Sequence, residues 1–542
     1  MPIPINPTLN PYPMARNMHT ARNGMVATSQ PLAAQAGLAV LQKGGNAIDA
    51  AIATAACLTV VEPTANGIGG DAFALVWTGG KLHGLNSSGP APESISIDAV
   101  KALGHNEMPK MGWLPVTVPG APAAWAALNK RFGKLSLAEC LAPAINYARN
   151  GYPLSPVLGR GWKAAFSSYK ANCTGPEFEH WFETFAPEGR APKIGEMWAS
   201  QAHAATLEEI ATTHAESFYR GSLAKKIAAF SEKHGGFLRE SDLAAFSPEW
   251  VNPISANYRG YDVWEIPPNG QGLVALIALN IMKGYGFPKG LSARNDTDIF
   301  HKQFEAMKLA FTCGKAVITD PAHMQAPVED LLSDSYADTL RGKIGPTAAE
   351  PVEILPPKGG TVYLATADGD GNMVSFIQSN YMGFGSGVVI PGTGIAMQNR
   401  GADFSLDPNH ANALKGGKRT YHTIIPGFLT KDGAPVGPFG VMGGYMQPQG
   451  HMQVVMNMVD FGLNPQAALD APRWQWTNGK NFEVEHHFPR HIAQGLAGLG
   501  HRITVPLESG GFGRGQIILR DPDSGVLYGG TESRTDGAIA AW

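Results

Sequence analysis

A strand–turn–strand pattern in the second half of the chain constrains the fold more than any other feature of the sequence. Residues 361–379 read TVYLATADGDGNMVSFIQS, so two β-prone runs flank an Asp-Gly-Asp-Gly turn. The residues before it, 322–360, end in paired prolines and paired glycines, which predicts an exposed, mobile connection. Thr361 is therefore expected to be the first residue of a strand that follows a loop.

Helical and strand patterns share the rest of the chain. Residues 31–43 have helical apolar spacing and stop at a glycine pair, and an alanine-rich helix is expected over 46–61. Residues 72–77 and 81–85 predict a second hairpin around Gly79 and Gly80, and residues 120–235 are mostly of helical type. Such a chain is expected to combine helices with antiparallel strands.

Composition and charge exclude several classes of protein. Hydrophobic residues make up 44% of the 542 residues and charged residues 16%, which suits a globular protein with a large core. The net charge of -3 forces no basic face, so nucleic acid is not expected as a partner. The most apolar run, 47–61, is too short and too polar to span a membrane. The four cysteines form no CxxC pair and no secretory signal precedes the chain, so a cytoplasmic protein is expected.

The position of Thr361 suggests a specific chemistry. A threonine hydroxyl is a weak nucleophile that needs a base, and its own amine can serve once the chain is cut before it. The same hydroxyl can make that cut by attacking the carbonyl of Gly360, whose missing Cβ permits strained backbone geometry. Taken alone, this pattern is also compatible with an ordinary strand threonine that follows a loop.

The surrounding segments strengthen the chemical interpretation. The sequence GGNAIDAAIATAACLTVVEPTANGIGGDAFAL at 44–75 closely resembles the N-terminal signature of the gamma-glutamyltranspeptidase family. Further segments of the same family type follow in order at 361–375, 383–406, 417–428, 441–450, 470–474 and 533–542. The resemblance implies an α+β fold, namely the four-layer αββα sandwich of N-terminal nucleophile hydrolases. It also implies self-cleavage into a large subunit, 1–360, and a small subunit, 361–542, intertwined in one domain, with no cofactor and no metal.

Four positions match the family's catalytic machinery. The resemblance makes Thr361 the nucleophile and makes Gly360–Thr361 the cleavage site. Gly443 and Gly444 match the pair of backbone N–H donors for the oxyanion, and each such donor can be worth roughly 3 kcal/mol. Ser379 falls where the family has a threonine that supports the nucleophile, and it keeps the hydroxyl. The plainer alternatives are a tight turn at the glycine pair and a strand-end polar residue at 379.

Several departures fall in the part of the site that holds the substrate. Ser88 aligns with the family's arginine for the glutamyl α-carboxylate. His422 and Thr423 align with its twin serines, and Tyr381 aligns with an asparagine near the nucleophile. The usual carboxylate clamp is therefore expected to be absent, and the pocket is expected to be smaller.

The amine side of the site also differs from the family pattern. Asp403 matches the acid that holds the glutamyl amine, but Arg400 stands where relatives carry an acid or an amide. A cation at that position would repel a substrate ammonium and attract a carboxylate. The alternative left open is that Arg400 simply pairs with Asp403.

Together these residues resemble the cytoplasmic branch of the family that includes enzymes similar to oxamate amidohydrolase. The expected partner is a small amide that bears a carboxylate, and the assembly is expected to contain the two subunits of one precursor, with a dimer of such pairs left open. Two alternatives remain: a gamma-glutamyl hydrolase or transferase, and an inactive scaffold. Two other signals are discounted: a metal at Glu483, Glu485 and His487, which are expected to face solvent, and a direct role for His451, which is given at most a supporting one.

Overall fold

The structure is a computed structural model that describes residues 16–351 and 360–542. Within these residues the fold mixes helices with two seven-stranded sheets, which we call the β10 sheet and the β13 sheet after a central strand of each. All strand pairs within the two sheets are antiparallel. The β10 sheet has the order β19 (Ala538–Ala541), β2 (Gly24–Thr28), β10 (Gly360–Asp368), β11 (Met373–Tyr381), β3 (Asp71–Thr78), β4 (Lys81–Ser87) and β7 (Glu249–Val251). The β13 sheet has the order β1 (His19–Ala21), β18 (Leu527–Thr531), β17 (Arg514–Arg520), β13 (Ala434–Met442), β12 (Gly427–Lys431), β9 (Tyr261–Glu265) and β8 (Ile254–Tyr258).

The two sheets pack against each other through a shared apolar layer. Phe73, Tyr363 and Ile377 of the β10 sheet contribute to it together with Phe428 and Ile518 of the β13 sheet. The approach is close, because a Cβ at Gly440 would lie 2.5 Å from the ring of Tyr363. Each sheet contains strands from both sides of residue 360, so the two parts of the chain are interlaced.

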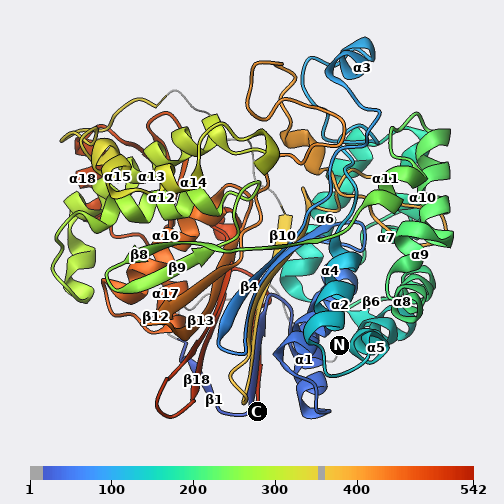
Figure 1. Cartoon of the computed structure of the whole chain (residues 1–542), viewed down its shortest axis with the longest axis horizontal. Helices are drawn as coiled ribbons and strands as arrows, with labels where there is room; N and C mark the ends of the chain where they lie inside the picture. Colours follow the sequence, from blue (N-terminus) through green and yellow to red (C-terminus); the bar gives the residue numbers. More distant parts are fainter. Residues whose placement is uncertain (1–15, 352–359) are drawn as a thin grey trace.

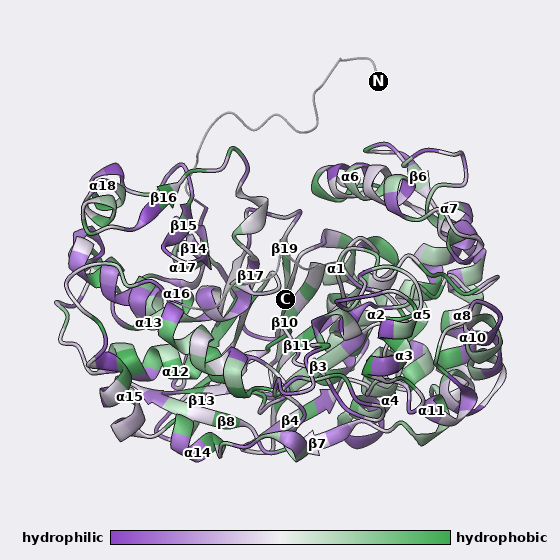
Figure 2. Cartoon of the chain, turned by 90° about the horizontal axis from the view of Figure 1, so that it is seen from above, coloured by the Kyte–Doolittle hydropathy of each residue, from purple (hydrophilic) through white to green (hydrophobic). Residues whose placement is uncertain are grey.

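Helices cover the outer side of each sheet, as Figures 1 and 2 show. The group beside the β10 sheet is α1 (Pro31–Gln42), α2 (Ala47–Val61), α4 (Ala121–Phe132), α5 (Leu137–Asn150), α6 (Pro156–Asn172), α7 (Glu179–Phe185), α8 (Gln201–Thr213), α9 (Glu216–Arg220), α10 (Ser222–Lys233) and α11 (Glu240–Ala245). The group beside the β13 sheet is α12 (Gly272–Lys283), α13 (Thr297–Val317), α14 (Val328–Leu331), α15 (Asp334–Arg341), α16 (Met446–Val459), α17 (Pro465–Asp470) and α18 (Arg490–Gly498). Helix α3 (Ile97–Ala102) and the small sheets β5 (Tyr152–Pro153) with β6 (Met197–Trp198), and β14 (Trp474–Asn478) with β15 (Asn481–Val484) and β16 (Arg502–Thr504), complete these elements.

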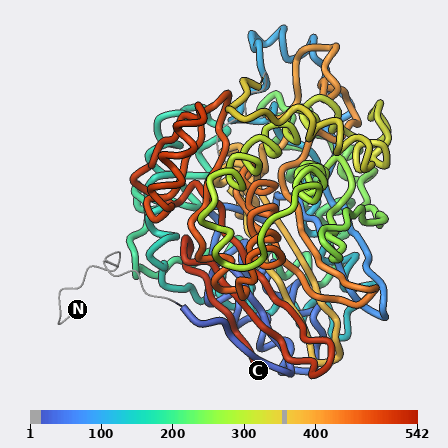
Figure 3. The backbone as a smooth tube through the Cα atoms, turned by 90° about the vertical axis from the view of Figure 1, so that its left-hand side faces the viewer, coloured from blue at the N-terminus to red at the C-terminus, as the bar shows by residue number. Residues whose placement is uncertain are grey.

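Local patterns explain the elements nearest the β10 sheet. Asn46 caps α2 in a capping box with Asp49, and every residue of α2 is buried, as its alanine-rich sequence predicts. The hairpin expected at 361–379 is β10 and β11, which lie between β2 and β3 in the middle of the sheet. The C-terminal strand β19 pairs with β2, so the two ends of the described chain run side by side (Figure 3).

The connection expected over 322–360 is only partly irregular. It contains α14 and α15, and the hydroxyl of Ser333 caps α15. Ala337 and Leu340 of α15 are buried against the neighbouring helices, which the prolines and glycines of this segment had obscured. Residues 352–359 lie outside the described residues.

Candidate active site

Thr361 lies at an irregularity at the start of β10. Gly360 pairs with Tyr381 of β11, but Val362 pairs with Gln378, so the register shifts around Thr361. A bulge of this kind changes the direction in which a side chain points and is common beside active sites. Thr361 is 1% exposed, and a Cβ at Gly360 would lie 3.0 Å from the nitrogen of Gly383. The junction is therefore closely enclosed.

Two hydroxyl groups lie against the carbonyl of the Gly360–Thr361 peptide bond. Thr361 Oγ1 donates to the oxygen of Gly360 at 2.8 Å, and Ser379 Oγ donates to the same oxygen at 2.8 Å. The two hydroxyl oxygens are 3.1 Å apart. Strand β11 places Ser379 there because it runs antiparallel beside β10. This arrangement brings a candidate nucleophile and a second hydroxyl to one carbonyl group.

Arg400 is a buried cation beside these hydroxyls. It lies in a short 3-10 turn, Arg400–Asp403, and is 1% exposed. Its Nη1 donates to Thr423 Oγ1 at 2.7 Å, and its Nη2 lies 3.5 Å from Ser379 Oγ. Its guanidinium carbon stands 4.1 Å from the ring centre of Tyr381, a cation–π contact. Arg400 therefore faces the site instead of the surface.

Asp403 is only partly paired with Arg400. Asp403 Oδ1 accepts hydrogen bonds from the hydroxyls of Tyr381, at 2.7 Å, and Tyr445, at 3.0 Å. Asp403 Oδ2 lies 3.6 Å from Arg400 Nη1. Within the described residues, neither Asp403 Oδ2 nor Arg400 Nε has a hydrogen-bond partner. The two expectations for Arg400, a pair with Asp403 and a cation in the site, are thus compatible.

Tyr381 holds these groups together at a strained position. Its φ angle is 74°, in the left-handed region that residues other than glycine seldom adopt. Its backbone N–H donates to Ser379 Oγ at 2.8 Å, and its side chain reaches Asp403. A bulky residue in this conformation is typical of functional sites, where surrounding contacts outweigh the backbone cost.

His422 belongs to a buried pair behind Arg400. Its Nε2 lies 3.0 Å from Asp71 Oδ2 of β3, and both side chains are fully buried. Burial raises the pKa of Asp71 to about 7, although the charge of Arg400 opposes this rise. Burial, together with Arg400, lowers the pKa of His422 well below its usual range. The neutral imidazole is therefore favoured.

Gly443 and Gly444 form the turn before α16. Their φ angles are 143° and 61°, and 143° is a conformation that glycine adopts far more readily than other residues. Gln271 Nε2 donates to the carbonyls of Thr423, at 2.6 Å, and Gly444, at 2.9 Å, which ties this turn to the segment that contacts Arg400. Among the backbone hydrogen bonds of the described loops and turns, none is donated by the N–H group of Gly443 or of Gly444. The role of these two N–H groups as oxyanion donors stays a prediction.

Ser88 lies apart from the nucleophile. Its hydroxyl donates to Asn86 Oδ1 at 2.8 Å and accepts from Asn269 Nδ2 at 3.2 Å. Its carbonyl accepts from Arg419 Nε at 2.9 Å. Among the described contacts, none joins Ser88 to Thr361. The structure thus gathers Thr361, Ser379, Tyr381, Arg400, Asp403 and Thr423 by direct contact and leaves Ser88 in a neighbouring network.

Lys315 and Tyr445 are site residues that the sequence interpretation missed. Lys315 Nζ, near the end of α13, bonds the hydroxyl of Tyr445 and stands 4.2 Å and 4.1 Å from the ring centres of Tyr421 and Tyr445. Tyr445 directly follows Gly443 and Gly444, so its position could have indicated a role. Lys315 lies far upstream on an amphipathic helix, where no local signal sets it apart.

One group of described residues has the chemistry of a metal site. His301 and Glu305 of α13 and His501 place ligand atoms within 4.8 Å of one another. However, Lys308 Nζ lies 2.5 Å from Glu305 Oε1, and His301 Nδ1 is 2.8 Å from His501 Nε2. The ammonium group already neutralises the carboxylate, so we interpret the cluster as a buried ion-pair network.

No helix of the described chain combines the length and the apolar character that crossing a bilayer requires.

Comparison with known proteins places the chain in one family. It matches the sequence model of the gamma-glutamyltranspeptidase family over residues 33–542. It is 38% identical to the glutathione hydrolase-like YwrD proenzyme of Bacillus subtilis, over 95% of this chain and 97% of that protein. It is 33% identical to the oxamate amidohydrolase proenzyme of Klebsiella pneumoniae, over 97% of this chain and 100% of that protein.

A solved structure agrees with these relatives. The cephalosporin acylase from Bacillus halodurans is 66% identical, with a TM-score of 0.96, over 100% of this chain and 99% of that chain. The match therefore extends over both sheets and both groups of helices. On its sequence and its fold, the chain belongs to the gamma-glutamyltranspeptidase family.

Proposed function

We propose that this enzyme is a self-processing amidohydrolase in which Thr361 is the nucleophile. The observation that carries the proposal is the contact of Thr361 Oγ1 with the carbonyl of Gly360, beside Ser379. Attack by Oγ1 on the Gly360 carbonyl carbon would replace the C–N bond with an ester bond and free the amine of Thr361, which takes up the hydroxyl proton. Water would then hydrolyse the ester, leaving the carboxylate of Gly360 and the hydroxyl of Thr361. The products would be subunits 1–360 and 361–542, and we infer that the two packed sheets with their outer helices are the αββα sandwich of N-terminal nucleophile hydrolases.

The mature reaction would repeat the same chemistry on an external amide. The freed amine of Thr361 would take the hydroxyl proton, Oγ1 would attack the substrate carbonyl, and the proton would pass to the departing amine. The N–H groups of Gly443 and Gly444 would hold the oxyanion, and Ser379 would position Oγ1. Water would then release the acyl group as an acid, and neither a cofactor nor a metal is needed for any of these steps.

The acyl group is proposed to be short and to carry a carboxylate. Arg400 offers a buried cation whose pairing with Asp403 is incomplete, which favours an anion at this place. Thr423 would help to orient Arg400. Tyr381, which lies against the guanidinium group, and His422, which is larger than the serine it replaces in the family, would limit the space. Ser88 replaces the usual arginine clamp, so an α-amino acid head group is less well accommodated. The similarity to oxamate amidohydrolase supports an oxamate-like amide.

Two other candidates remain in the same mechanistic class. A gamma-glutamyl hydrolase or transferase is favoured by the similarity to the glutathione hydrolase-like YwrD proenzyme. An acylase with a larger amine half is favoured by the 66% identity to cephalosporin acylase. An inactive scaffold is disfavoured by the enclosed hydroxyl–carbonyl contact.

From the four free cysteines we keep the expectation of a cytoplasmic enzyme, and a dimer of subunit pairs stays open.

Substitution of the nucleophile tests the proposal directly. Thr361→Ala should leave one uncut chain without amidase activity, whereas Thr361→Ser should cut and turn over more slowly. Gel electrophoresis, with sequencing of the new N-terminus, reads the cut. A release assay across oxamate, glutaryl amides, glutathione and a γ-glutamyl anilide reads the substrate. Normal two-chain protein from Thr361→Ala would refute the mechanism, and a preference for glutathione would replace the proposed substrate with the γ-glutamyl one.

A further inference from the structure

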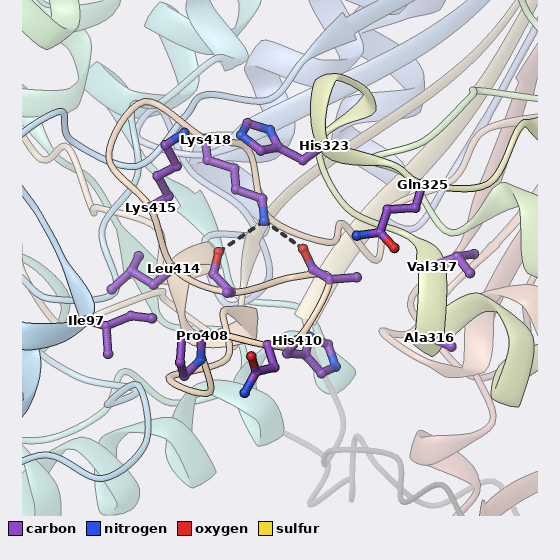
Figure 4. Close-up of a pocket in the computed structure, with 13 residues that line it drawn as sticks. Ile97, Ala316, Val317, His323, Gln325, Pro408, His410, Leu414, Lys415 and Lys418 are labelled. Atoms are coloured by element: carbon purple, nitrogen blue, oxygen red, sulfur yellow. Dashed lines mark hydrogen bonds between the residues drawn. The ribbon is translucent and has the colours of Figure 1, made fainter.

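A cavity of about 500 Å³ opens beside the acyl site, between the segment 408–418 and the end of α13 (Figure 4). Every titratable side chain among its lining residues is basic: Lys415, Lys418, His323 and His410. His323, His410 and Lys415 are exposed around its mouth, and Lys418 is buried at 4% exposure. The lining contains no carboxylate, so the cavity favours an anionic ligand.

Lys418 is the buried cation of this cavity. Its ammonium donates to the carbonyls of Ala411, at 2.7 Å, and Ala413, at 3.1 Å, as Figure 4 shows. An ammonium group has three N–H donors, so one remains for a ligand. Among the described residues no carboxylate lies within ion-pair distance of Lys418.

The charges around Lys418 compensate it only in part. Burial lowers its pKa; Asp320 opposes this effect, and Lys415 adds to it. Asp320 is itself engaged, because its two carboxylate oxygens accept from the backbone N–H groups of Ala322 and Arg419. A buried cation that has only neutral carbonyl partners gains most from an added anion.

The cavity shares a wall with the acyl site. Asn412 lies between the two carbonyls that hold Lys418. Its Nδ2 donates to the backbone carbonyl of Asp403 at 2.8 Å, and its Oδ1 accepts from the backbone N–H of Tyr421 at 3.0 Å. On the other side, Ala316 of α13 lines the cavity next to Lys315, which contacts Tyr445. The wall of the cavity is therefore tied to Asp403 and Tyr445, which both belong to the candidate site.

We infer that this cavity binds a carboxylate on the amine half of the substrate, with Lys418 as its principal partner. The inference rests on the proposed function and adds a second anionic recognition point to it. The substrate would then carry a carboxylate on each side of the scissile amide, held by Arg400 on the acyl side and by Lys418 on the amine side. A carboxylate suits the single remaining N–H better than a phosphate, which requires more donors.

Binding of the free amine tests the site without any turnover. The probes are 4-aminobenzoate and its uncharged analogue aniline, measured by calorimetry with the processed wild-type enzyme, since neither probe contains an amide bond to be hydrolysed. The wild-type cavity should favour 4-aminobenzoate by about tenfold or more, a typical effect of one charge-assisted hydrogen bond. Lys418→Gln keeps two N–H donors for the loop carbonyls but removes the charge, so it should abolish most of that preference. Lys415→Gln, at the exposed mouth, is the matched control and should change the preference less than about threefold.

Turnover of a matched pair of substrates then tests whether the cavity binds the amine half of the substrate during the reaction. The pair is the N-oxalyl amide of 4-aminobenzoate and that of aniline, and the readout is the ratio of their kcat/KM values. This ratio should favour the carboxylate by about tenfold and should fall towards one in Lys418→Gln. Two controls separate loss of the charge from loss of the loop structure. Thermal melting detects a loss of structure, and a Lys418→Arg variant, which keeps the charge, should keep the preference for the carboxylate.

The possible outcomes are distinct. No difference between the two amines in either assay, or a preference that survives Lys418→Gln, would overturn the inference. A preference in the binding assay alone, with equal turnover of the two substrates, would identify a site for a free carboxylate effector and would refute the role in substrate binding. If neither amide is turned over, the proposed substrate fails, while the binding assay still decides the site.

Discussion

Among the arginine–carboxylate clusters of the described residues, two with deeply buried side chains are built in opposite ways. In the first, Arg473 and Arg534 pair with Glu532 at 2.7 Å and 2.5 Å, and Arg534 also pairs with Glu485. All four carboxylate oxygens of Glu532 and Glu485 accept hydrogen bonds. Although burial opposes it, the charges of Arg473 and Arg534 lower the pKa of Glu532 to about 2.

The second cluster, Arg400 with Asp403, is left open. Its nitrogen–oxygen distance is 3.6 Å, and Asp403 Oδ2 has no hydrogen-bond partner among the described residues, whereas every carboxylate oxygen of the first cluster has one. A guanidinium Nε without a partner occurs in both clusters, at Arg400 and at Arg473. The side chains of both clusters are almost fully buried, so burial alone does not separate them. The difference suggests that a closed network serves the fold, whereas an incompletely paired cluster beside a hydroxyl is reserved for a ligand.

The largest effect is expected from opening the closed cluster. Glu532→Gln removes the charge between two buried arginines and should lower the free energy of unfolding by about 3–5 kcal/mol. Chemical denaturation measures this loss. The protein that stays folded should keep its KM, because the cluster has no described contact with Arg400. A fall in stability below about 1 kcal/mol would contradict the structural role.

The second effect concerns the open cluster. Arg400→Gln should raise KM for a carboxylate-bearing amide by about one to two orders of magnitude, because a charge-assisted hydrogen bond contributes roughly 1.5–3 kcal/mol. Turnover should fall less, since the anion is held in both ground state and transition state. Steady-state kinetics and denaturation of the same sample separate binding from stability. A loss of stability as large as that of Glu532→Gln would erase the distinction between the two clusters.

A smaller effect is expected at the glycine turn before α16. Gly444 has a φ of 61°, where an added Cβ costs roughly 1–2 kcal/mol. Gly444→Ala should shift the turn and lower kcat, with little change in KM, if its N–H group holds the oxyanion. Gly433→Ala, in a surface turn with a φ of 77°, has the same backbone cost and serves as the control. Equal activity of the two variants would remove Gly444 from the site.

The smallest effect concerns the pH dependence of stability that arises from Asp71 and His422, whose contributions should largely cancel in the wild type. Because the pKa of Asp71 is raised, the folded state binds the Asp71 proton more tightly than the unfolded state does. The contribution of Asp71 to the free energy of unfolding therefore falls as pH rises from about 4 to 7. The lowered pKa of His422 acts in the opposite direction, because its contribution to stability falls as pH drops below about 6.5. The two slopes should nearly cancel as pH falls below about 6.5.

Removal of one partner reveals the other. Asp71→Asn leaves only the histidine contribution, so melting temperature should rise with pH up to about 6.5 in this variant and stay nearly flat in the wild type. Melting curves at several pH values provide the comparison. A flat profile in Asp71→Asn would show that His422 does not titrate as inferred.

Local sequence patterns were enough to predict the central elements. Helices α1 and α2 and the β10–β11 hairpin follow from apolar spacing, an alanine-rich run and a glycine turn, all of which act over a few residues. The pattern around residue 485 was misleading. Alternation placed Glu485 on a solvated strand face, but β15 ends at Val484 and Glu485 is buried against Arg534. Its partner lies far along the chain, and no local pattern reports such a contact.

The candidate site shows the same limit. Its glycines and hydroxyls could be named from the sequence because short segments carry them. The partners of those residues could not: His422 meets Asp71 across 351 positions, and Lys315 meets Tyr445 across 130. Long-range contacts of this kind depend on how the sheets and helices pack, which periodicity does not encode.

The left-handed backbone at Tyr381 has a consequence for engineering. A procedure that selects substitutions for stability alone would favour glycine there, because glycine adopts a φ of 74° without strain. That choice would remove the ring under Arg400 and the hydroxyl on Asp403, so a gain in melting temperature would come with a loss of acyl recognition. Thermostable variants of this enzyme should therefore be sought with position 381 held fixed.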